Sequence, residues 1–479
     1  MIKVTAIFDV GKTNKKLLLF DVHGNVLKEK LTKFKTIKDE DGFPCENILA
    51  ITKWIKKEWG QLLTSKEFLP IAVNFTAFGA SFVHLDVDGK PVAPVYDYLK
   101  PIPKAILKKF YVQIRVKHGQ NSKEFAETTC SPKLGMLNSG IQLFWIKKCN
   151  PKLWEKIDCS LHLPQYLSFL ITNQRVSDYT SIGCHTALWN FRKFRYASWV
   201  NKDIETKLAP IASDRFTLIH EKKNGQRAIK AGYGLHDSSA ALIPYLHPSN
   251  QSFILISTGT WSIQLNPFNS SSLTNEQLHK DCLCYMQTDG SQVKASRLLL
   301  GKEHDFQVAR IAKHFRVKGG FSKHLEFDET IFWKVRIQIK NTFYPACMEG
   351  SGPFPKPPED VWDISCFENE VEAYHSLITE LVSMLKVSIQ LIDVPRVKTF
   401  FVDGGFARNN VFMNTLAYSL FKKKVVASFL PQSTALGAFL YLHELNGISN
   451  ENFNRYFKVY QYSKKYKDIN RVTRNRSIK

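Results

Sequence analysis

The opening of the chain alternates between strand-type residues and a short polar turn, and this pattern restricts the fold most strongly. Residues 4–10 and 15–21 are mainly β-branched, aliphatic or aromatic, and the residues between them are small or polar. The segment matches a relaxed Walker A pattern that ends in Gly11-Lys12-Thr13. A Walker A loop leads from a strand into a helix, whereas a second strand and a turn follow in this chain. The sequence therefore predicts a β-hairpin and not a P-loop.

The tip of this predicted hairpin carries residue types that bind nucleotide phosphates. Gly11 leaves backbone N–H groups accessible, and Lys12 and Thr13 add a cation and a hydroxyl donor. Asp9, on the strand before the tip, is placed to reach a magnesium ion or its water ligands. We therefore expect an ATP phosphate site at this turn, with Mg²⁺ nearby.

Length and composition are those of a globular protein with more than one domain. The 479 residues are enough for two or three domains, and 44% of them are hydrophobic. No apolar run reaches the roughly 20 residues that a membrane helix needs. The chain starts directly with a strand pattern, so a signal peptide is not expected either. The nine cysteines are scattered, which indicates reduced thiols and a cytoplasmic protein.

The net charge of +23 is compatible with an anionic partner. The charge is spread along the chain, with one dense region at residues 453–479, where nine Lys and Arg residues accompany one acidic residue. Tyrosines in this tail leave open stacking on single-stranded nucleic acid, but we interpret the tail as a solvated extension. Because a recognition motif is lacking, nucleic acid is an unlikely partner. ATP and phosphosugars are anions that suit a basic enzyme equally well.

A second hairpin pattern near the middle of the chain indicates an internal duplication. Residues 242–252 contain two prolines and several small polar residues, as at a domain boundary. Strand-type residues then flank Ser257-Thr258-Gly259-Thr260, and Gly259 stands where Gly11 stands in the first hairpin. A nucleotide would lie in the cleft between the two halves. The predicted parts are an N-terminal domain at 1–245, a C-terminal domain at 252–447 and a basic extension at 448–479.

Periodic apolar residues predict the main helices. For a helix at 47–59, the apolar face is expected to hold Ile48, Leu49, Ile51, Ile55 and Trp59. Residues 369–393 also follow the helical period. A strand at 399–403 then leads through Gly404-Gly405 into a helix at 411–420. Glycines between a strand and a helix let the backbone approach a flat ligand or a phosphate closely.

The polar residues His236, Asp237 and Ser238 stand between glycines and a run of small residues. A carboxylate at the start of a helix, with room for a ligand, is well placed to act as a general base. The alternative is that Asp237 only caps a helix at 238–245, and this segment taken alone favours that alternative. The other motifs decide between them.

The hairpin Asp-x-Gly-x-Thr, the turn Gly-x-His-Asp, the hairpin Ser-Thr-Gly-Thr-Trp and the turn Asp-Gly-Gly-x-x-x-Asn occur in that order. Their order and spacing resemble the FGGY carbohydrate kinases over residues 1–447. The resemblance implies an α/β fold of the two-domain actin-like (ribonuclease H-like) ATPase/sugar kinase type, with duplicated mixed sheets and an interdomain cleft. Within the family, residues 236–238 and 257–261 are most similar to the rhamnulokinase subgroup.

The resemblance implies roles for individual residues, beginning with Asp237 as the catalytic base and Asp9 near Mg²⁺. The implied nucleotide contacts are Gly11, Lys12, Thr13, Asn14, Lys16, Gly259, Thr260, Gly405 and Asn409. The implied substrate contacts are Ala80, Ser81, Asp97, His236 and Ser238.

Other positions stay open or depart from the family pattern. Asp97 could also be a turn or cap residue. Gln307 could reach the nucleotide, and Arg297 and His304 could face a ligand or lie on the surface. Ser81 stands where relatives usually have Asp, and Lys12 and Lys16 stand where many relatives have Thr and Arg. These departures concern the identity of the sugar more than the use of ATP.

The implied activity is ATP-dependent phosphorylation of a ketose hydroxyl. L-Rhamnulose is the first choice, and L-fuculose, D-ribulose and D-xylulose remain open. Asp237 would accept the hydroxyl proton, and closure of the domains over the sugar would limit hydrolysis of ATP. The alternative is a catalytically inactive ATP-binding sensor or scaffold of the same fold, against which the presence of Asp237 argues. A homodimer is also left open, since dimers are usual among relatives.

Overall fold

The computed structural model describes residues 1–221, 227–246, 251–337, 342–349, 351–354, 362–443 and 457–460. The chain forms two compact units. The first unit comprises residues 1–250, 267–295 and 431–453, and the second comprises 251–266, 296–430 and 454–479. Most of the predicted extension at 448–479 lies outside the described residues.

The first unit is built on a seven-stranded mixed sheet with the order β11-β12-β6-β1-β2-β3, in which β13 also pairs with β6. Its strands are β1 (Ile2–Val10), β2 (Lys15–Phe20), β3 (Val26–Thr32), β6 (Phe68–Ala77), β11 (Phe216–Glu221), β12 (Arg227–Gly232) and β13 (Leu235–His236). Its longer helices are α1 (Ile48–Leu63), α2 (Lys104–His118), α3 (Ser122–Thr129), α4 (Ser139–Cys149) and α6 (Leu163–Thr172). Shorter elements are α5 (Pro151–Lys156), α7 (Tyr179–Ile182), α8 (Lys202–Glu205), α9 (Asp237–Leu242), α10 (Asn275–His279), and the strand pair β7 (Phe82–Leu85) with β8 (Cys159–His162).

The opening hairpin is confirmed. Strand β1 pairs antiparallel with β2, and the register joins Val10 to Lys15 across the tip. The strand after the tip is what distinguishes this turn from a P-loop. Strand β1 also pairs in parallel with β6, so it lies inside the sheet, and six of its nine residues are buried.

Helix α1 covers one face of this sheet, and one predicted member of its apolar face is wrong. Its buried residues are Ile48, Ile51, Trp54, Ile55, Trp59 and Leu62. Leu49 is 61% exposed, because it lies about 100° around the helix from Ile48 and so outside the buried stripe. Trp54, which the sequence reasoning omitted, packs edge-on against Phe8 of β1 with ring centroids 5.4 Å apart.

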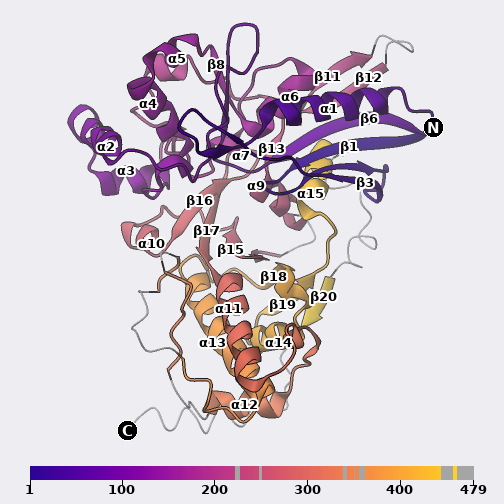
Figure 1. The fold of residues 1–479 in the computed structure, drawn as a ribbon, viewed down its shortest axis with the longest axis vertical. Helices are drawn as coiled ribbons and strands as arrows, with labels where there is room; N and C mark the ends of the chain where they lie inside the picture. The colour runs from indigo at the N-terminus through magenta and orange to yellow at the C-terminus, as the bar shows by residue number, and fades with distance from the viewer. Residues whose placement is uncertain are drawn as a thin grey trace. The chain divides into compact units, whose positions relative to one another are not determined.

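The first unit is completed by a helix from near the end of the described chain, α15 (Ser433–His443). Figure 1 shows this yellow helix beside α9 and the indigo and violet strands of the N-terminal part. A Cβ atom at Gly437 would lie 1.8 Å from the carbonyl oxygen of Ala240 in α9, so only glycine permits this approach. The side-chain amide of Asn74 on β6 donates to the carbonyl of Ala438 at 3.0 Å.

The second unit contains a mixed sheet whose strands within the unit have the order β15-β14-β18-β19-β20. Helices α11 and α13 pack side by side, and α14 packs on α13 (Figure 1). Strand β17 (Gln292–Leu298) crosses the division between the units, and β16 (Cys282–Met286) belongs to the first. The strands are β14 (Phe253–Thr258), β15 (Ser262–Asn266), β18 (Thr399–Gly404), β19 (Lys424–Ser428) and β20 (Phe457–Tyr460), and the helices are α11 (Leu300–Phe315), α12 (Glu329–Ile337), α13 (Glu370–Gln390) and α14 (Asn410–Ser419).

The second predicted hairpin, the long helix and the strand–glycine–helix segment are confirmed. Strands β14 and β15 pair antiparallel, and β14 pairs in parallel with β18, which sets Thr258 beside Gly404. Within the described ranges, no helix is both long and apolar enough to cross a bilayer. All nine cysteines lie in described ranges, and none forms a disulfide.

We expect Ile55→Ala to destabilise the first unit far more than Leu49→Ala on the same helix. Ile55 is fully buried and Leu49 is largely exposed. Truncation of a buried isoleucine leaves a cavity and costs about 2–5 kcal/mol, whereas an exposed change stays within about 0.5 kcal/mol. Urea unfolding of both variants measures the difference. Equal losses in the two variants would contradict this orientation of α1.

Candidate functional site

Three strands of the first unit end at one edge of its sheet. In the parallel pairings, Val10 of β1 and His236 of β13 both lie opposite Ala77 of β6. The chain therefore leaves the sheet at the same level into the hairpin tip, into the loop after β6 and into helix α9. This edge brings Asp9 and Asp237 into electrostatic range of each other.

Asp9 lies at this edge, and the groups around it do not fully balance the negative charge of its carboxylate. The hydroxyl of Thr76 donates to its Oδ1 at 2.8 Å. Burial raises the pKa of Asp9 to about 6, and the charges of Asp237 and Glu29 act in the same direction, while Thr76 and Lys16 oppose the rise. A carboxylate in this state would be stabilised by a nearby cation.

Asp237 is the first residue of α9, and the helix-capping position is His236. The interpretation of Asp237 as the N-cap is therefore wrong. Its Oδ1 accepts from the backbone N–H of Ser238 at 2.6 Å and from the Ser238 hydroxyl at 3.2 Å. The Asp237 side chain is 31% exposed, so a carboxylate oxygen remains accessible to a ligand.

His236 is buried beside Asp237. Its Nε2 lies 3.2 Å from Asp237 Oδ1 and 3.4 Å from the sulfur of Cys184. Its ring stacks on Tyr285 with centroids 5.6 Å apart. Burial lowers the pKa of His236, so the ring is neutral at neutral pH. Its Nδ1 is buried and has no partner among the described residues.

The loop after β6 is pressed against this histidine. A Cβ atom at Gly79 would lie 2.9 Å from His236 Nε2. Ala80 adopts a left-handed φ of 57°, and its carbonyl accepts from the side-chain amide of Gln142 at 2.8 Å. Ser81 is buried, and its carbonyl accepts from the backbone N–H of Leu163. Hydrogen bonds to its backbone carbonyls hold the loop in place. A sugar contact by Ala80 or Ser81 stays a prediction.

Lys12 is engaged by residues of two loops. Its ammonium donates to Asp97 Oδ2 at 2.6 Å and lies 3.6 Å from Glu46 Oε1. It also lies 5.1 Å from the ring centroids of both Phe78 and Tyr98. Sequence reasoning missed Glu46, which has no motif around it and comes close only through the fold.

The rest of the hairpin tip is exposed or lightly paired. Thr13 and Asn14 are exposed. The ammonium of Lys16 donates to Gln432 Oε1 at 2.6 Å and lies 3.3 Å from Glu29 Oε1. Lys16 is also directly opposite Asp9 in the β1–β2 pairing. These residues can act on a phosphate together, which stays a prediction.

The second unit has its own pocket, with a volume of about 520 Å³. It brings together all four nucleotide contacts predicted for this unit, which come from two separate segments of the chain. Its lining residues are Gly259, Thr260, Gly301, His304, Asp305, Ser322, Lys323, Gly405, Phe406, Arg408 and Asn409. The volume and the small residues suit a flat heterocycle with a phosphate tail.

A buried tyrosine, Tyr374, orients the polar side of this pocket. The side-chain amide of Asn409 donates to its hydroxyl at 2.6 Å, and His304 Nε2 lies 3.1 Å from the same oxygen. Asn409 also caps α14 by accepting from the N–H of Phe412. Gln307 is fully buried, and its amide donates to Glu303 rather than lining the pocket. Sequence reasoning missed Tyr374 because it lies inside an ordinary apolar helical stripe.

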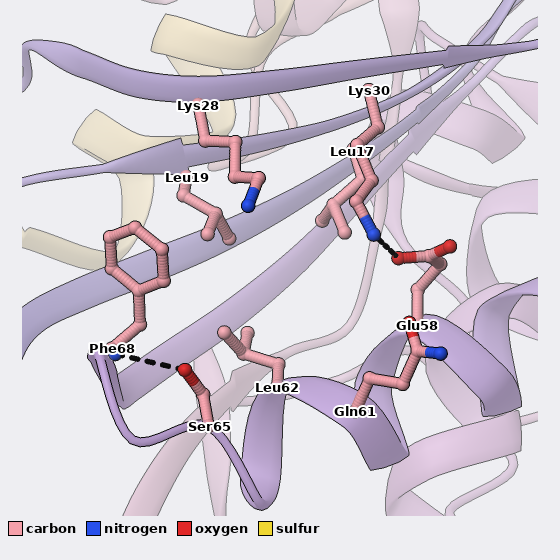
Figure 2. Close-up of a pocket in the computed structure, with 9 residues that line it drawn as sticks. All are labelled: Leu17, Leu19, Lys28, Lys30, Glu58, Gln61, Leu62, Ser65 and Phe68. Atoms are coloured by element: carbon pink, nitrogen blue, oxygen red, sulfur yellow. Dashed lines mark hydrogen bonds and ion pairs between the residues drawn. The ribbon is translucent and has the colours of Figure 1, made fainter.

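Another hollow, of about 210 Å³, lies between α1 and strands β2 and β3. Figure 2 shows Lys28 and Lys30 above an apolar floor that includes Leu62 and Phe68. The ammonium of Lys30 donates to Glu58 at 2.5 Å. The predicted site residues lie elsewhere, so we do not assign the phosphate or sugar site to this hollow.

Models of one protein family match both halves of the chain. Residues 4–207 match the N-terminal domain of the FGGY family of carbohydrate kinases, and residues 250–450 match its C-terminal domain. The chain is 24% identical over 392 residues to a rhamnulokinase from Oceanobacillus iheyensis, and the match covers 77% of each chain. It is 23% identical over 454 residues to a rhamnulokinase from Halalkalibacterium halodurans, which covers 89% of this chain and 88% of the relative.

A solved structure has the same fold. The crystal structure of a carbohydrate kinase from Novosphingobium aromaticivorans superposes with a TM-score of 0.78 at 20% identity and covers 99% of this chain and all of that one. The expected α/β fold with two domains and duplicated mixed sheets is therefore confirmed.

We expect Asp9→Asn to stabilise the protein at neutral pH. The pKa of Asp9 is raised from 3.8 to about 6, so the folded protein holds this proton more tightly than the unfolded chain between those values. The ionised carboxylate therefore lowers the free energy of unfolding above pH 6, by about 1–3 kcal/mol. Thermal unfolding without nucleotide should show the gain at pH 7.5 and its disappearance near pH 4.

The exposed Asp88 provides the matched control, because Asp88→Asn changes the same chemical group at the surface. It should leave the melting temperature unchanged at both pH values. Destabilisation by Asp9→Asn at pH 7.5 would show that the carboxylate serves the fold rather than a ligand.

Proposed function

The chain belongs to the FGGY family of carbohydrate kinases, and we propose that its phosphoryl acceptor is a ketose, with Asp237 as the general base. L-Rhamnulose is the first choice because both relatives described above are rhamnulokinases. L-Fuculose, D-ribulose and D-xylulose are the other candidates, since they differ from it by a methyl group or hydroxyl orientations. The observation that carries the proposal is the partly exposed carboxylate of Asp237 at the sheet edge that also holds Asp9 and the hairpin tip.

The proton transfer follows from the environment of Asp237. A sugar hydroxyl is a poor nucleophile until its proton is removed, and a positioned carboxylate typically contributes a factor of about 10²–10⁴ to the rate. One oxygen of Asp237 is fixed by Ser238, and the partly exposed side chain leaves the carboxylate accessible to a substrate. Burial lowers the pKa of His236, which makes its ring a weaker proton acceptor than an exposed histidine.

The larger contribution is the positioning of the acceptor in line with the γ-phosphate. We propose that the exposed tip residues Thr13 and Asn14, with Lys16, bind the phosphate groups of ATP. We also propose that the pocket beside Gly405 and Asn409 binds the adenosine.

The chemistry of Asp9 fits a magnesium ion held mainly by the nucleotide. Among the described residues, no group of three or more His, Cys, Asp or Glu side chains is arranged to hold a metal. Mg²⁺ is commonly bound through one or two carboxylates together with substrate phosphates. A bound magnesium ion would neutralise charge on the phosphoryl oxygens. Asp9, whose raised pKa reports an uncompensated carboxylate, is the residue that would hold it or its water ligands.

The second candidate function is an ATP-binding sensor or scaffold of the same fold that transfers no phosphate. Retention of Asp237 in an accessible position disfavours it. A cytoplasmic location and the absence of nucleic-acid binding stay predictions, and a homodimer stays open.

ADP release from MgATP against a panel of ketoses and polyols tests the proposal. We expect turnover with one ketose, and a fall of about 10²–10⁴-fold in kcat for Asp237→Asn with little change in the KM for ATP. Asp88→Asn, at an exposed position, is the control with normal turnover. Tight ATP binding with no sugar-dependent turnover would favour the sensor or scaffold.

A separate variant tests the nucleotide pocket. Tyr374→Phe removes the hydroxyl that contacts Asn409 and His304, and each buried polar group left unpaired weakens the arrangement. We expect the KM for ATP to rise about 3–10-fold, while the KM for the ketose stays within about twofold. An unchanged KM for ATP would place the nucleotide elsewhere.

A further inference from the structure

We infer that Lys12 contacts the sugar and not the phosphates of ATP. Together with Asp97 it forms a charged pair that accepts an uncharged sugar and disfavours a sugar acid. The inference rests on the proposed kinase function and narrows its substrate class. It also separates Lys12 from the phosphate contacts that the family resemblance implies for this position.

The ammonium of Lys12 is held by carboxylates that lie deeper in the protein. Asp97 Oδ2 accepts from it at 2.6 Å, and Glu46 Oε1 is 3.6 Å away. The Lys12 side chain is 33% exposed, whereas those of Asp97 and Glu46 are 9% and 5% exposed. Such a charge-assisted hydrogen bond to a shielded carboxylate is stronger than a surface ion pair. The Lys12 ammonium is therefore directed to these carboxylates.

Two aromatic rings fix the same direction. The Lys12 ammonium is 5.1 Å from the ring centroids of Phe78 and of Tyr98, which is within the range of cation–π attraction. Phe78 begins the loop that presses Gly79 against His236. Tyr98 follows Asp97 and lies within electrostatic range of Asp237. Both rings thus belong to loops that border the proposed sugar-binding residues.

The charges around Lys12 balance locally. Lys15 is buried; its ammonium lies 3.0 Å from Glu46 Oε2 and donates to the backbone carbonyl of Lys12. Two ammonium groups therefore face two carboxylates, those of Glu46 and Asp97. A carboxylate on the substrate would meet a cation that is already paired and two shielded anions, which is an unfavourable combination.

A hydroxyl group of the substrate can hydrogen-bond to the same charged pair. It can donate to a free lone pair of Asp97 and accept from a remaining N–H of the Lys12 ammonium. A site built to pair polar groups of the substrate rejects molecules that leave those groups unpaired. The geometry therefore favours a neutral ketose or polyol over an aldonate.

The test compares three variants in the kinase assay. Lys12→Gln removes the cation and keeps a polar side chain. Asp97→Asn removes the anion but keeps the Oδ1 that accepts from the N–H of Leu99. Lys90→Gln is the control, because Lys90 pairs with Asp88 at 3.4 Å on the surface, where both side chains are largely exposed.

We expect Lys12→Gln and Asp97→Asn to raise the KM for the neutral ketose at least about tenfold, with the KM for ATP within about twofold of the wild type. Asp97→Asn, which leaves the Lys12 cation less compensated, should raise the kcat/KM ratio of aldonate to ketose at least about tenfold. Lys90→Gln should change none of these values. The unchanged KM for ATP also shows that each variant is folded.

A rise in the KM for ATP alone in Lys12→Gln would return Lys12 to the phosphates and overturn the inference. An equal rise in the KM for ATP and in the KM for the ketose, or no change in either value, would overturn it as well. A wild-type enzyme that prefers an aldonate would refute the inference and leave the kinase function intact. A wild-type protein that phosphorylates no acceptor would instead remove the proposed function, and this inference with it.

Discussion

Strand β6 is the element on which the described site of the first unit depends. It pairs in parallel with β1 on one side and with β12 and β13 on the other. Parallel strands must all end at the same edge of a sheet, so the hairpin tip, the loop after Ala77 and the start of α9 are brought together by backbone hydrogen bonds alone. The side chains that could perform chemistry are thus placed by the sheet before any of them makes a specific contact.

Local patterns predicted the elements well and the contacts poorly. Alternating strand residues around residues 11–14 and 257–260 predicted both hairpins, because a strand's period is short and its turn residues are distinctive. Leu49 was misplaced because neighbouring positions in a helix differ by a large rotation. The order of motifs then identified the family, which single motifs could not do.

Residues that come together from distant parts of the chain were beyond prediction from sequence. Lys12 and Asp97 are separated by 85 positions, and nothing near either residue indicates the other. Glu46 and Tyr374 were missed for the same reason, since each sits in an unremarkable local pattern. Gln307 and His304 lie on one helix, and only packing decides that the first is buried while the second lines a pocket.

The return of α15 to the first unit has a consequence for how this protein is made. Synthesis proceeds from the N-terminus, so more than 430 residues are translated before Gly437 can approach α9. Until then, the amide of Asn74 has no Ala438 carbonyl to bind, and the surface that α15 covers on β6 and β1 is exposed. Residues 296–430 of the second unit leave the ribosome earlier than this closing helix. The usual order, in which an N-terminal domain finishes folding first, is therefore not available to this chain, and a protein expressed only to residue 245 would lack part of its own core.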